Sequence, residues 1–409
     1  MRFLSQVLAT VLGLFIFSVF SFLLFIIIIA AVGGSQSEFK PITEKTVITL
    51  DLNEITNDYG GKFSFKDFSY TEEESAGFSD VLEGLKHAAN DSQIKGISIL
   101  NSNINLGMAQ SKSLRDQLIE FKKSGKFIVA YADSYAQKDY YLNSVADTIF
   151  LNPVGELELK GLASEVMYFK DFQEKSGIKM EIIRHGKYKS AVEPFLSNEM
   201  SPENREQITS ILESVWQVIA QDIASSRNLS MEQINSIAEN LSGRTPEKAL
   251  ELKLIDKIAY EDEYHNGIKK ALKISTDEDY HTISITDYAK NKKLIAPTND
   301  DAIAIVYAQG IIWGGEGDET YIGEQSLKRA LGGIRKDDKI KAVVLRIDSP
   351  GGSALTSELI WREIELTKQK KPVVVSMGNT AASGGYYIAC GANRIFAEPT
   401  TITGSIGVF

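Results

Sequence analysis

The sequence predicts a duplicated α/β protein with a membrane-spanning helix at its N-terminus. Three observations in the 409 residues lead to this prediction. A long uncharged apolar run lies near the N-terminus, short apolar runs alternate with amphipathic segments, and one unit occurs twice, with Tyr140 and Tyr386 as partners 246 positions apart. Alternating strand and helix patterns indicate parallel sheets that are connected by right-handed crossovers.

The uncharged run covers residues 11–32 and is long enough to cross about 30 Å of hydrocarbon as a helix. We therefore predict a membrane anchor at 9–33, preceded by a cytoplasmic segment at 1–8. A cleaved secretory signal with its cleavage site near Ala30 is the alternative, but the run exceeds the usual apolar region of about 7–15 residues. Because Arg2 precedes the run, the positive-inside rule places the body of the protein on the outer side of the membrane.

Beyond the anchor, predicted strands and helices follow one another in two series. Apolar runs predict buried strands at 47–52, 94–100, 127–131 and 148–151, and again at 303–307, 342–347, 373–376 and 394–397. Helical spacing of apolar residues predicts helices at 110–121, 203–225 and 357–367; the apolar face of the 203–225 helix packs either in the interior or against another subunit. A polar stretch at 291–301 is the predicted linker between a first repeat at 46–290 and a second repeat at 302–409.

The two repeats agree in residues that build the fold and differ in residues that could carry chemistry. At the constant offset, Val129 matches Val375, and the match extends over residues 94–161 without a gap. The differing pairs are Gly352 with Leu106, Ser383 with Gln137, and Ser405 with Leu159. We therefore expect the duplication to have kept the fold in both repeats and the chemistry of these loops in the second. The second repeat stops at Phe409, although the first continues well beyond the counterpart Ala163, so we expect a longer natural chain.

Composition argues against several classes of function. The formal net charge of −10 disfavours a nucleic-acid partner, because binding to phosphates needs clustered Lys and Arg. The single cysteine, Cys390, rules out a disulfide framework, and its apolar surroundings predict a small core residue. The 4 histidines lack the close pairing of a zinc site, so we expect neither a metal nor another cofactor.

Two segments of the second repeat are candidates for a nucleophilic site. Residues 349–353 (SPGGS) follow a predicted strand, and their glycines could present backbone N–H groups as an oxyanion hole, although a tight turn would have the same composition. Ser383 is flanked by alanine and glycine, which leave its hydroxyl accessible; a helix N-cap is the alternative role. The second repeat has no histidine, so a histidine base would come from the first repeat, and a buried lysine with a lowered pKa is the simpler base.

Four motifs carry a resemblance to a known family. They are YKSAVEPF at 188–195, DSPGG at 348–352, ASGGYY at 382–387 and TGSIGV at 403–408. In this order they resemble the signal peptide peptidase A (protease IV) family in its long, duplicated form, and the likeness extends from the anchor to Phe409. The resemblance implies tandem ClpP/crotonase-like domains and a membrane-anchored serine endopeptidase that degrades cleaved signal peptides.

The resemblance also implies the site residues and the surroundings of the protein. Ser383 would be the nucleophile, Lys189 the general base, Gly352 and Gly384 the oxyanion donors, and Ser405 the residue that orients the lysine. The family's setting would be the bacterial cytoplasmic (inner) membrane, with a single span and the catalytic body on the periplasmic side. Expected partners are hydrophobic peptides, the lipid bilayer and further copies of the chain in a homo-oligomer.

Two alternatives remain at this stage. Lys187 lies two positions from Lys189 and would share a face with it on an extended segment, so spacing does not choose between them; only Lys189 stands directly before Ser190 as in the family motif. The function could also be that of an inactive membrane scaffold or of a crotonase-like acyl-CoA enzyme. Retention of the serine and lysine pattern disfavours the scaffold, and the membrane anchor disfavours the acyl-CoA enzyme.

Overall fold

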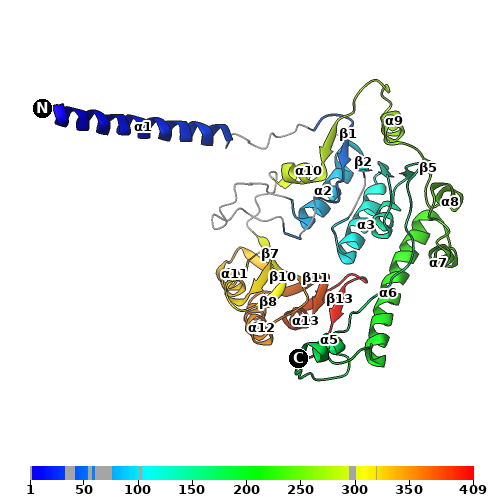
Figure 1. The fold of residues 1–409 in the computed structure, drawn as a ribbon. Helices are drawn as coiled ribbons and strands as arrows, with labels where there is room; N and C mark the ends of the chain where they lie inside the picture. The colour runs from blue at the N-terminus through cyan, green and yellow to red at the C-terminus, as the bar shows by residue number, and fades with distance from the viewer. Residues whose placement is uncertain are drawn as a thin grey trace. The chain divides into compact units, whose positions relative to one another are not determined.

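The structure is a computed structural model that describes residues 2–32, 42–53, 58–59, 76–100, 104–293, 301–318 and 320–409 (Figure 1). It contains two units, Met1–Ile42 and Thr43–Phe409. The first unit holds helix α1 (Arg2–Val32), in which Ser5–Ile26 is long and apolar enough to cross a membrane. The predicted N-terminal apolar helix is therefore confirmed, and it begins before the predicted anchor at 9–33. Position 33 lies outside the described residues.

The first sheet has six parallel strands in the order β5-β4-β3-β2-β1-β6. The strands are β1 (Thr46–Thr49), β2 (Ile94–Leu100), β3 (Phe127–Ala132), β4 (Thr148–Leu151), β5 (Lys257–Ile258) and β6 (Thr282–Ser284). The helices are α2 (Phe78–Asn90), α3 (Met108–Lys122), α4 (Gln137–Asn143), α5 (Lys170–Ser176), α6 (Pro202–Arg227), α7 (Met231–Asn240), α8 (Pro246–Glu251), α9 (Glu261–Leu272) and α10 (Ile285–Lys293), with a short 3₁₀ helix η1 (Glu193–Phe195). Predicted strands at 94–100 and 148–151 match in both bounds, whereas the first strand ends at Thr49 and not at residue 52.

The second sheet is also parallel, with the order β12-β11-β10-β7 and β13 paired to β11. Its strands are β7 (Ala302–Gln309), β10 (Ile340–Ser349), β11 (Val373–Ala382), β12 (Arg394–Phe396) and β13 (Ile402–Gly404). Helices α11 (Glu324–Lys336), α12 (Ala354–Lys368) and α13 (Gly384–Ala389) pack on one face of it, and β8 (Ile311–Trp313) pairs with β9 (Tyr321–Gly323) beside it. The predicted α/β class with two parallel sheets is confirmed. The predicted linker falls partly on α10, and its residues 294–300 lie outside the described part of the chain.

Some predicted buried segments are exposed on one side. Ile303 on β7 and Phe396 on β12 are exposed, so the prediction of fully buried strands is wrong for one face of the second sheet. On α6, Ile219 and Ile223 are buried but Ile211 is exposed. The apolar face of α6 is therefore interior only toward the end of the helix.

The duplication is visible in hydrogen bonds that occur twice. Before β2, the amide of Ile94 donates to Asp91 O; before β10, the amide of Ile340 donates to Asp337 O, at the expected offset. Farther along, β13 pairs Thr403 with Ala381, and the first repeat has the matching bridge between Leu157 and Tyr135. The two repeats therefore share contacts in the fold as well as residue types in the sequence.

The offset nevertheless changes inside this region. The amides of Asp147 and Asn393 donate to Ile128 O and Val373 O respectively, and the carboxylate of Asp147 and the amide group of Asn393 accept in return. Ile128 is thus the counterpart of Val373, one position away from the constant offset. The prediction of a match without a gap, and of Val129 with Val375, is wrong. The second repeat lacks one residue before β11 and regains it by Ala381, whose pairing with Thr403 matches the pairing of Tyr135 with Leu157.

Candidate active site

Ser383 lies at the junction of β11 and α13, where the chain leaves the sheet. Its backbone has φ 52 and ψ −115, a left-handed conformation that costs energy for a residue with a side chain. The amide of Ser383 donates to Gly404 O at 2.8 Å, and its carbonyl accepts from Tyr387 N at 2.9 Å. Ser383 occupies the N-cap position, but its side chain makes no capping hydrogen bond. The hydroxyl is therefore available for other contacts.

Lys189 comes from the loop between α5 and η1, in the first repeat, and its amine lies beside that hydroxyl. The Nζ atom is 3.1 Å from Ser383 Oγ and 3.2 Å from Ser405 Oγ, and it donates to the main-chain oxygen of Ser405 at 2.6 Å. The residue is only 4 % exposed, and burial lowers the pKa of its amine. A neutral amine that donates to Ser405 retains a lone pair, which can accept the proton of Ser383.

Glu193, which the sequence reasoning missed, shapes the loop that carries Lys189. Its buried carboxylate accepts from Ser201 N at 2.8 Å, from Ser201 Oγ at 2.6 Å and from Asn204 Nδ2 at 3.2 Å, at the start of α6. Burial alone would raise the pKa of Glu193, but these hydrogen bonds and nearby Arg184 outweigh it and lower the pKa. The position of Glu193 in the motif at 188–195 was the sequence signal that could have identified it. Its ionised carboxylate ties the loop to α6.

Lys187, the alternative base, lies outside the site. Its side chain is exposed and forms an ion pair with Glu203 at 3.1 Å. In the described chain, Lys189 is the lysine that contacts Ser383. The catalytic role of Lys189 stays a prediction.

Two glycines bring backbone close to Ser383. Gly352 has φ 155, and a Cβ atom there would lie 2.1 Å from Ile312 O. The loop is fixed by the amide of Ile312, which donates to Gly351 O, and by the amide of Ser353, which donates to Ile312 O, both at 2.9 Å. A Cβ atom on Gly384 would lie 3.2 Å from the Gly352 amide nitrogen, so these two backbone segments are adjacent. Both backbone segments lie beside Ser383, and the oxyanion role of their N–H groups also stays a prediction.

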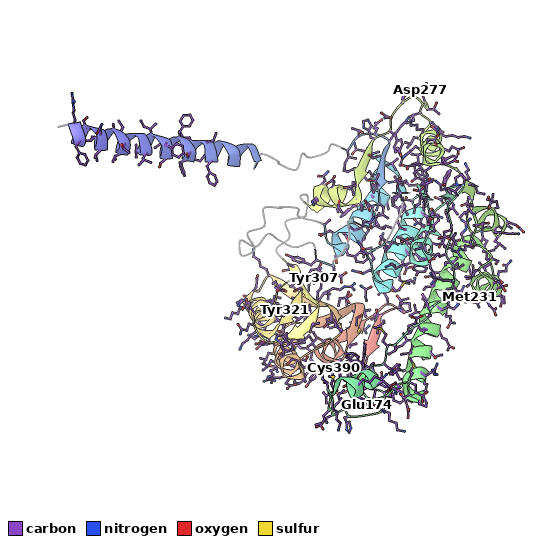
Figure 2. The ribbon with its side chains drawn as sticks, viewed as in Figure 1. Glu174, Met231, Asp277, Tyr307, Tyr321 and Cys390 are labelled. Carbon is purple, nitrogen blue, oxygen red and sulfur yellow. The ribbon has the colours of Figure 1, made fainter. Side chains whose placement is uncertain are left out.

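A cavity of about 680 Å³ opens beside these groups. Lys189, Gly352, Ser383 and Gly384 line one part of it, and apolar side chains line the rest: Trp313, Ile406, Val408 and Phe409, with Tyr386 and Tyr387. Cys390, labelled in Figure 2, also lines the cavity and is exposed. The prediction that Cys390 is a core residue is therefore wrong. The lining is mainly apolar, as is usual for ligand pockets.

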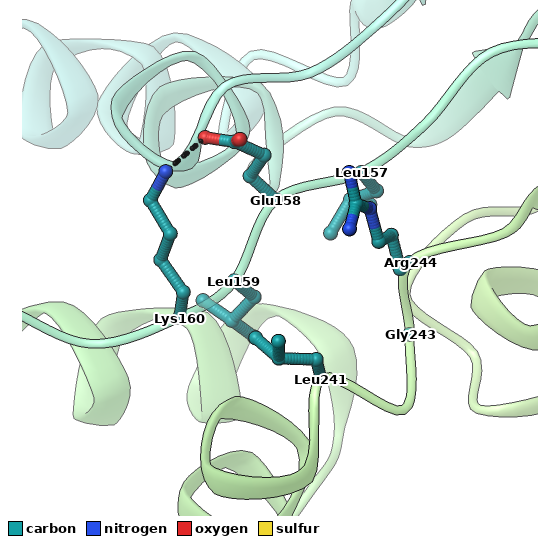
Figure 3. Close-up of a pocket in the computed structure, with 7 residues that line it drawn as sticks. All are labelled: Leu157, Glu158, Leu159, Lys160, Leu241, Gly243 and Arg244. Atoms are coloured by element: carbon teal, nitrogen blue, oxygen red, sulfur yellow. Dashed lines mark hydrogen bonds and ion pairs between the residues drawn. The ribbon is translucent and has the colours of Figure 1, made fainter.

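The corresponding loops of the first repeat are closed by side chains. Gln137, the counterpart of Ser383, accepts from the amides of Lys160 and Gly161 at 2.8 and 2.9 Å and donates to Gly161 O at 2.9 Å. Lys138, the counterpart of Gly384, donates to Leu106 O at 2.8 Å. The nearby pocket in Figure 3 has about 190 Å³ and is lined by residues 157–160 and by Leu241, Gly243 and Arg244. An ion pair of 2.7 Å joins Lys160 to Glu158 there.

Comparison with known proteins agrees with the resemblance described above. The sequence profile of Peptidase family S49 matches residues 120–275 and 365–409. Protease 4 of Salmonella typhi is 36% identical over 340 residues, which cover 81% of this chain and 54% of that protein. Protease 4 of Haemophilus influenzae is 36% identical over 341 residues, covering 81% of this chain and 55% of that protein. The chloroplastic serine protease SPPA of Arabidopsis thaliana is 35% identical over 335 residues, covering 80% and 49%.

The chain spans about half the length of the curated relatives it matches. The profile covers parts of both repeats, and the relatives align with most of this chain. The predicted resemblance is confirmed: the chain is similar to members of peptidase family S49.

Proposed function

We propose that this chain belongs to a membrane-anchored serine endopeptidase with a Ser–Lys dyad, which hydrolyses hydrophobic peptides such as the signal peptides that remain after cleavage. The observation that carries the proposal is the 3.1 Å contact between Lys189 Nζ and Ser383 Oγ, in a setting that lowers the pKa of the lysine. A buried lysine without its proton can act as the general base for a serine.

In the proposed reaction, Ser383 attacks the scissile carbonyl while Lys189 takes the proton from its hydroxyl. The amides of Gly352 and Gly384 stabilise the oxyanion that forms. Lys189 then gives the proton to the leaving amine, and the acyl-enzyme is hydrolysed by a water molecule from which Lys189 removes a proton. Ser405 holds the amine through its hydroxyl and its main-chain oxygen.

The proposed substrate class follows from the lining of the cavity. Its apolar side chains favour hydrophobic peptide segments, and among the described residues no Asp, Glu, Arg or His and no lysine other than Lys189 lines it. An apolar anchor on the same chain would keep the enzyme at the bilayer, where such peptides accumulate.

The dyad is tested by hydrolysis of a hydrophobic peptide ester by the full-length protein. Ser383→Ala and Lys189→Arg should each lower turnover by roughly 10³-fold or more while the protein stays folded, because guanidinium remains protonated and cannot act as a base. Ser405→Ala should cost roughly 10- to 1000-fold, because it removes a group that orients the lysine. Lys187→Ala is the matched control and should keep normal turnover. Normal turnover by Lys189→Arg would refute the dyad and direct attention to His185.

The proposed topology is a single span in the bacterial cytoplasmic membrane with the catalytic body on the periplasmic side. It is supported by the apolar helix α1 and by Arg2 at its start. The first repeat (46–290) would supply the base and the second (302–409) the nucleophile, and several copies would assemble. Protease added to intact spheroplasts should digest the body; digestion only after lysis would contradict this orientation.

A further inference from the structure

The strand that leads to Ser383 contains a bulge. Between Met377 and Ala381, β11 advances by two more residues than β10, and the carboxylate of Asp348 on β10 fills the space beside it. Asp348 Oδ1 accepts from the amide of Thr380 at 2.9 Å, and Oδ2 accepts from Asn379 Nδ2 at 2.9 Å. A Cβ atom on Gly378 would lie 2.9 Å from Asp348 Cβ, so the close approach requires glycine.

The first repeat contacts this bulge from the other side, through the start of α3. The amide of Gln110 donates to Asn379 Oδ1 at 3.2 Å, and Asn379 Nδ2 donates to Gln110 Oε1 at 2.8 Å. A Cβ atom on Gly107 would lie 2.2 Å from Asn379 Cγ. The Asn379 side chain is thus bonded on one side by Asp348 of its own repeat and on the other by Gln110 of the first repeat.

A second connection between the repeats holds the beginning of the bulge. Arg346 on β10 donates to Ser376 Oγ at 2.9 Å and to Met377 O at 2.8 Å. Its Nε donates to Asp58 Oδ2 at 2.6 Å, and Gln110 Nε2 donates to Asp58 Oδ1 at 3.0 Å. Asp58 and Gln110 are buried. Hydrogen bonds within such a buried network reinforce one another and favour a single arrangement.

The start of α3, which contacts Asn379, corresponds to a helix start beside the candidate site of the second repeat. Its N-cap, Gly107, is the counterpart of Ser353, the N-cap of α12, which directly follows the glycines beside Ser383. In the second repeat, this helix start therefore adjoins the candidate site of its own repeat. In the first repeat, the same helix start packs against the strand that carries the nucleophile of the other repeat. The closed repeat thus retains a contact that bears on the site.

We propose that Asn379 is a positioning residue, which, held between Gln110 and Asp348, fixes the backbone from which Ser383 projects. The inference rests on the proposed function, in which Ser383 is the nucleophile. Ser383 has a strained φ of 52, and such a conformation persists only where the surroundings determine it fully. The bulge ends at Ala381, with only Ala382 before Ser383, so a shift of Asn379 is passed along the strand to Ser383 Oγ. A displacement of about 1 Å at a reacting group can cost about 100-fold in rate.

The test measures kcat for each titrated serine, with a fluorophosphonate to count reactive Ser383 in the full-length protein. Asn379→Ala and Gln110→Ala should each lower kcat per titrated serine by about 10- to 100-fold, with KM changed less than about twofold. The double variant should lose about as much as either single variant, because both remove the same contact. A merely structural role would reduce the number of reactive serines and leave kcat per serine unchanged.

Ser113→Ala is the matched control. Ser113 lies on α3 and also bridges the repeats, by donating to Glu398 at 2.7 Å, but it does not touch the bulge. Its kcat per titrated serine should be normal. If Asn379→Ala and Gln110→Ala both keep kcat within about twofold, the positioning role is refuted while the dyad stands. If Ser383→Ala is still labelled and active, the proposed function itself fails. Should Asn379→Ala not fold, Gln110→Ala decides the question from the other repeat.

Discussion

The two repeats present the same loops in opposite states. In the second repeat, Ser383 and Gly384 border an open cavity of about 680 Å³. In the first, their counterparts Gln137 and Lys138 extend across the corresponding space and bond to backbone of neighbouring loops. The backbone pairing that surrounds these positions is retained in both. A few polar side chains that hydrogen-bond to the backbone of the loops are therefore enough to close a site of this kind, without a change of fold.

The two sheets also differ on one face, the face opposite the helices that connect consecutive parallel strands. In the first repeat, Tyr264, Ile268 and Leu272 of α9 pack over this face, and Phe150 beneath them is 3% exposed. Its counterpart Phe396 in the second sheet is 58% exposed. The same apolar position is thus buried in one sheet and exposed in the other. In the described chain, a helix covers this face only in the first sheet.

The prediction with the largest expected effect tests whether this face is covered in the first sheet and exposed in the second. Val47 is fully buried under α9, so Val47→Lys should lower the free energy of unfolding by more than about 4 kcal/mol, because it buries an unpaired charge. Ile303, at the corresponding place on β7, is 65% exposed, and Ile303→Lys should change stability by less than about 0.5 kcal/mol. Urea unfolding of residues 1–409 in detergent, followed by circular dichroism, gives both values. Equal destabilisation would show that the face of the second sheet is also covered.

The next effect tests the open and closed loops. A Cβ atom on Gly384 would lie 2.6 Å from Ser357 Oγ and would displace the backbone beside Gly352. Gly384→Ala should therefore lower kcat by roughly 10²- to 10³-fold, the usual cost of losing one oxyanion donor. Lys138→Ala, at the counterpart position, should keep kcat within about twofold in the same peptide ester assay. A substantial loss with Lys138→Ala would mean that the closed repeat takes part in catalysis directly.

The smallest effect concerns pH, because burial lowers the pKa of both Lys189 and Lys138. The unfolded lysine holds its proton up to about pH 10.5, whereas the folded one releases it at lower pH, so stability rises with pH between these two values. Lys189→Met and Lys138→Met should each flatten this rise in the urea midpoint. The rate should increase with pH through the pKa of Lys189, and Lys138→Met should leave that profile unchanged. A shifted profile in Lys138→Met would contradict the assignment of the base.

Local patterns determined much of this protein without any structure. The uncharged run predicted the apolar helix, and short apolar segments predicted β2 and β4 with their bounds, since strand and helix periodicity follow from the backbone alone. The repeat and its differing loop residues were also readable, because a duplication leaves its record in the order of residues. The choice of Lys189 over Lys187 came from the motif.

Tertiary structure decided what the residues of distant segments do to one another. The contact between Lys189 and Ser383 joins positions 194 apart, and the bonds from Glu193 to α6 and from Asn379 to Gln110 depend on how loops and repeats pack. The shift of one residue around β11 was invisible because a deletion and an insertion cancel outside that strand. Phe396 was predicted to be buried because its strand is apolar, but it is exposed. Apolar composition indicates that a strand favours burial, whereas only tertiary packing decides whether another element covers it.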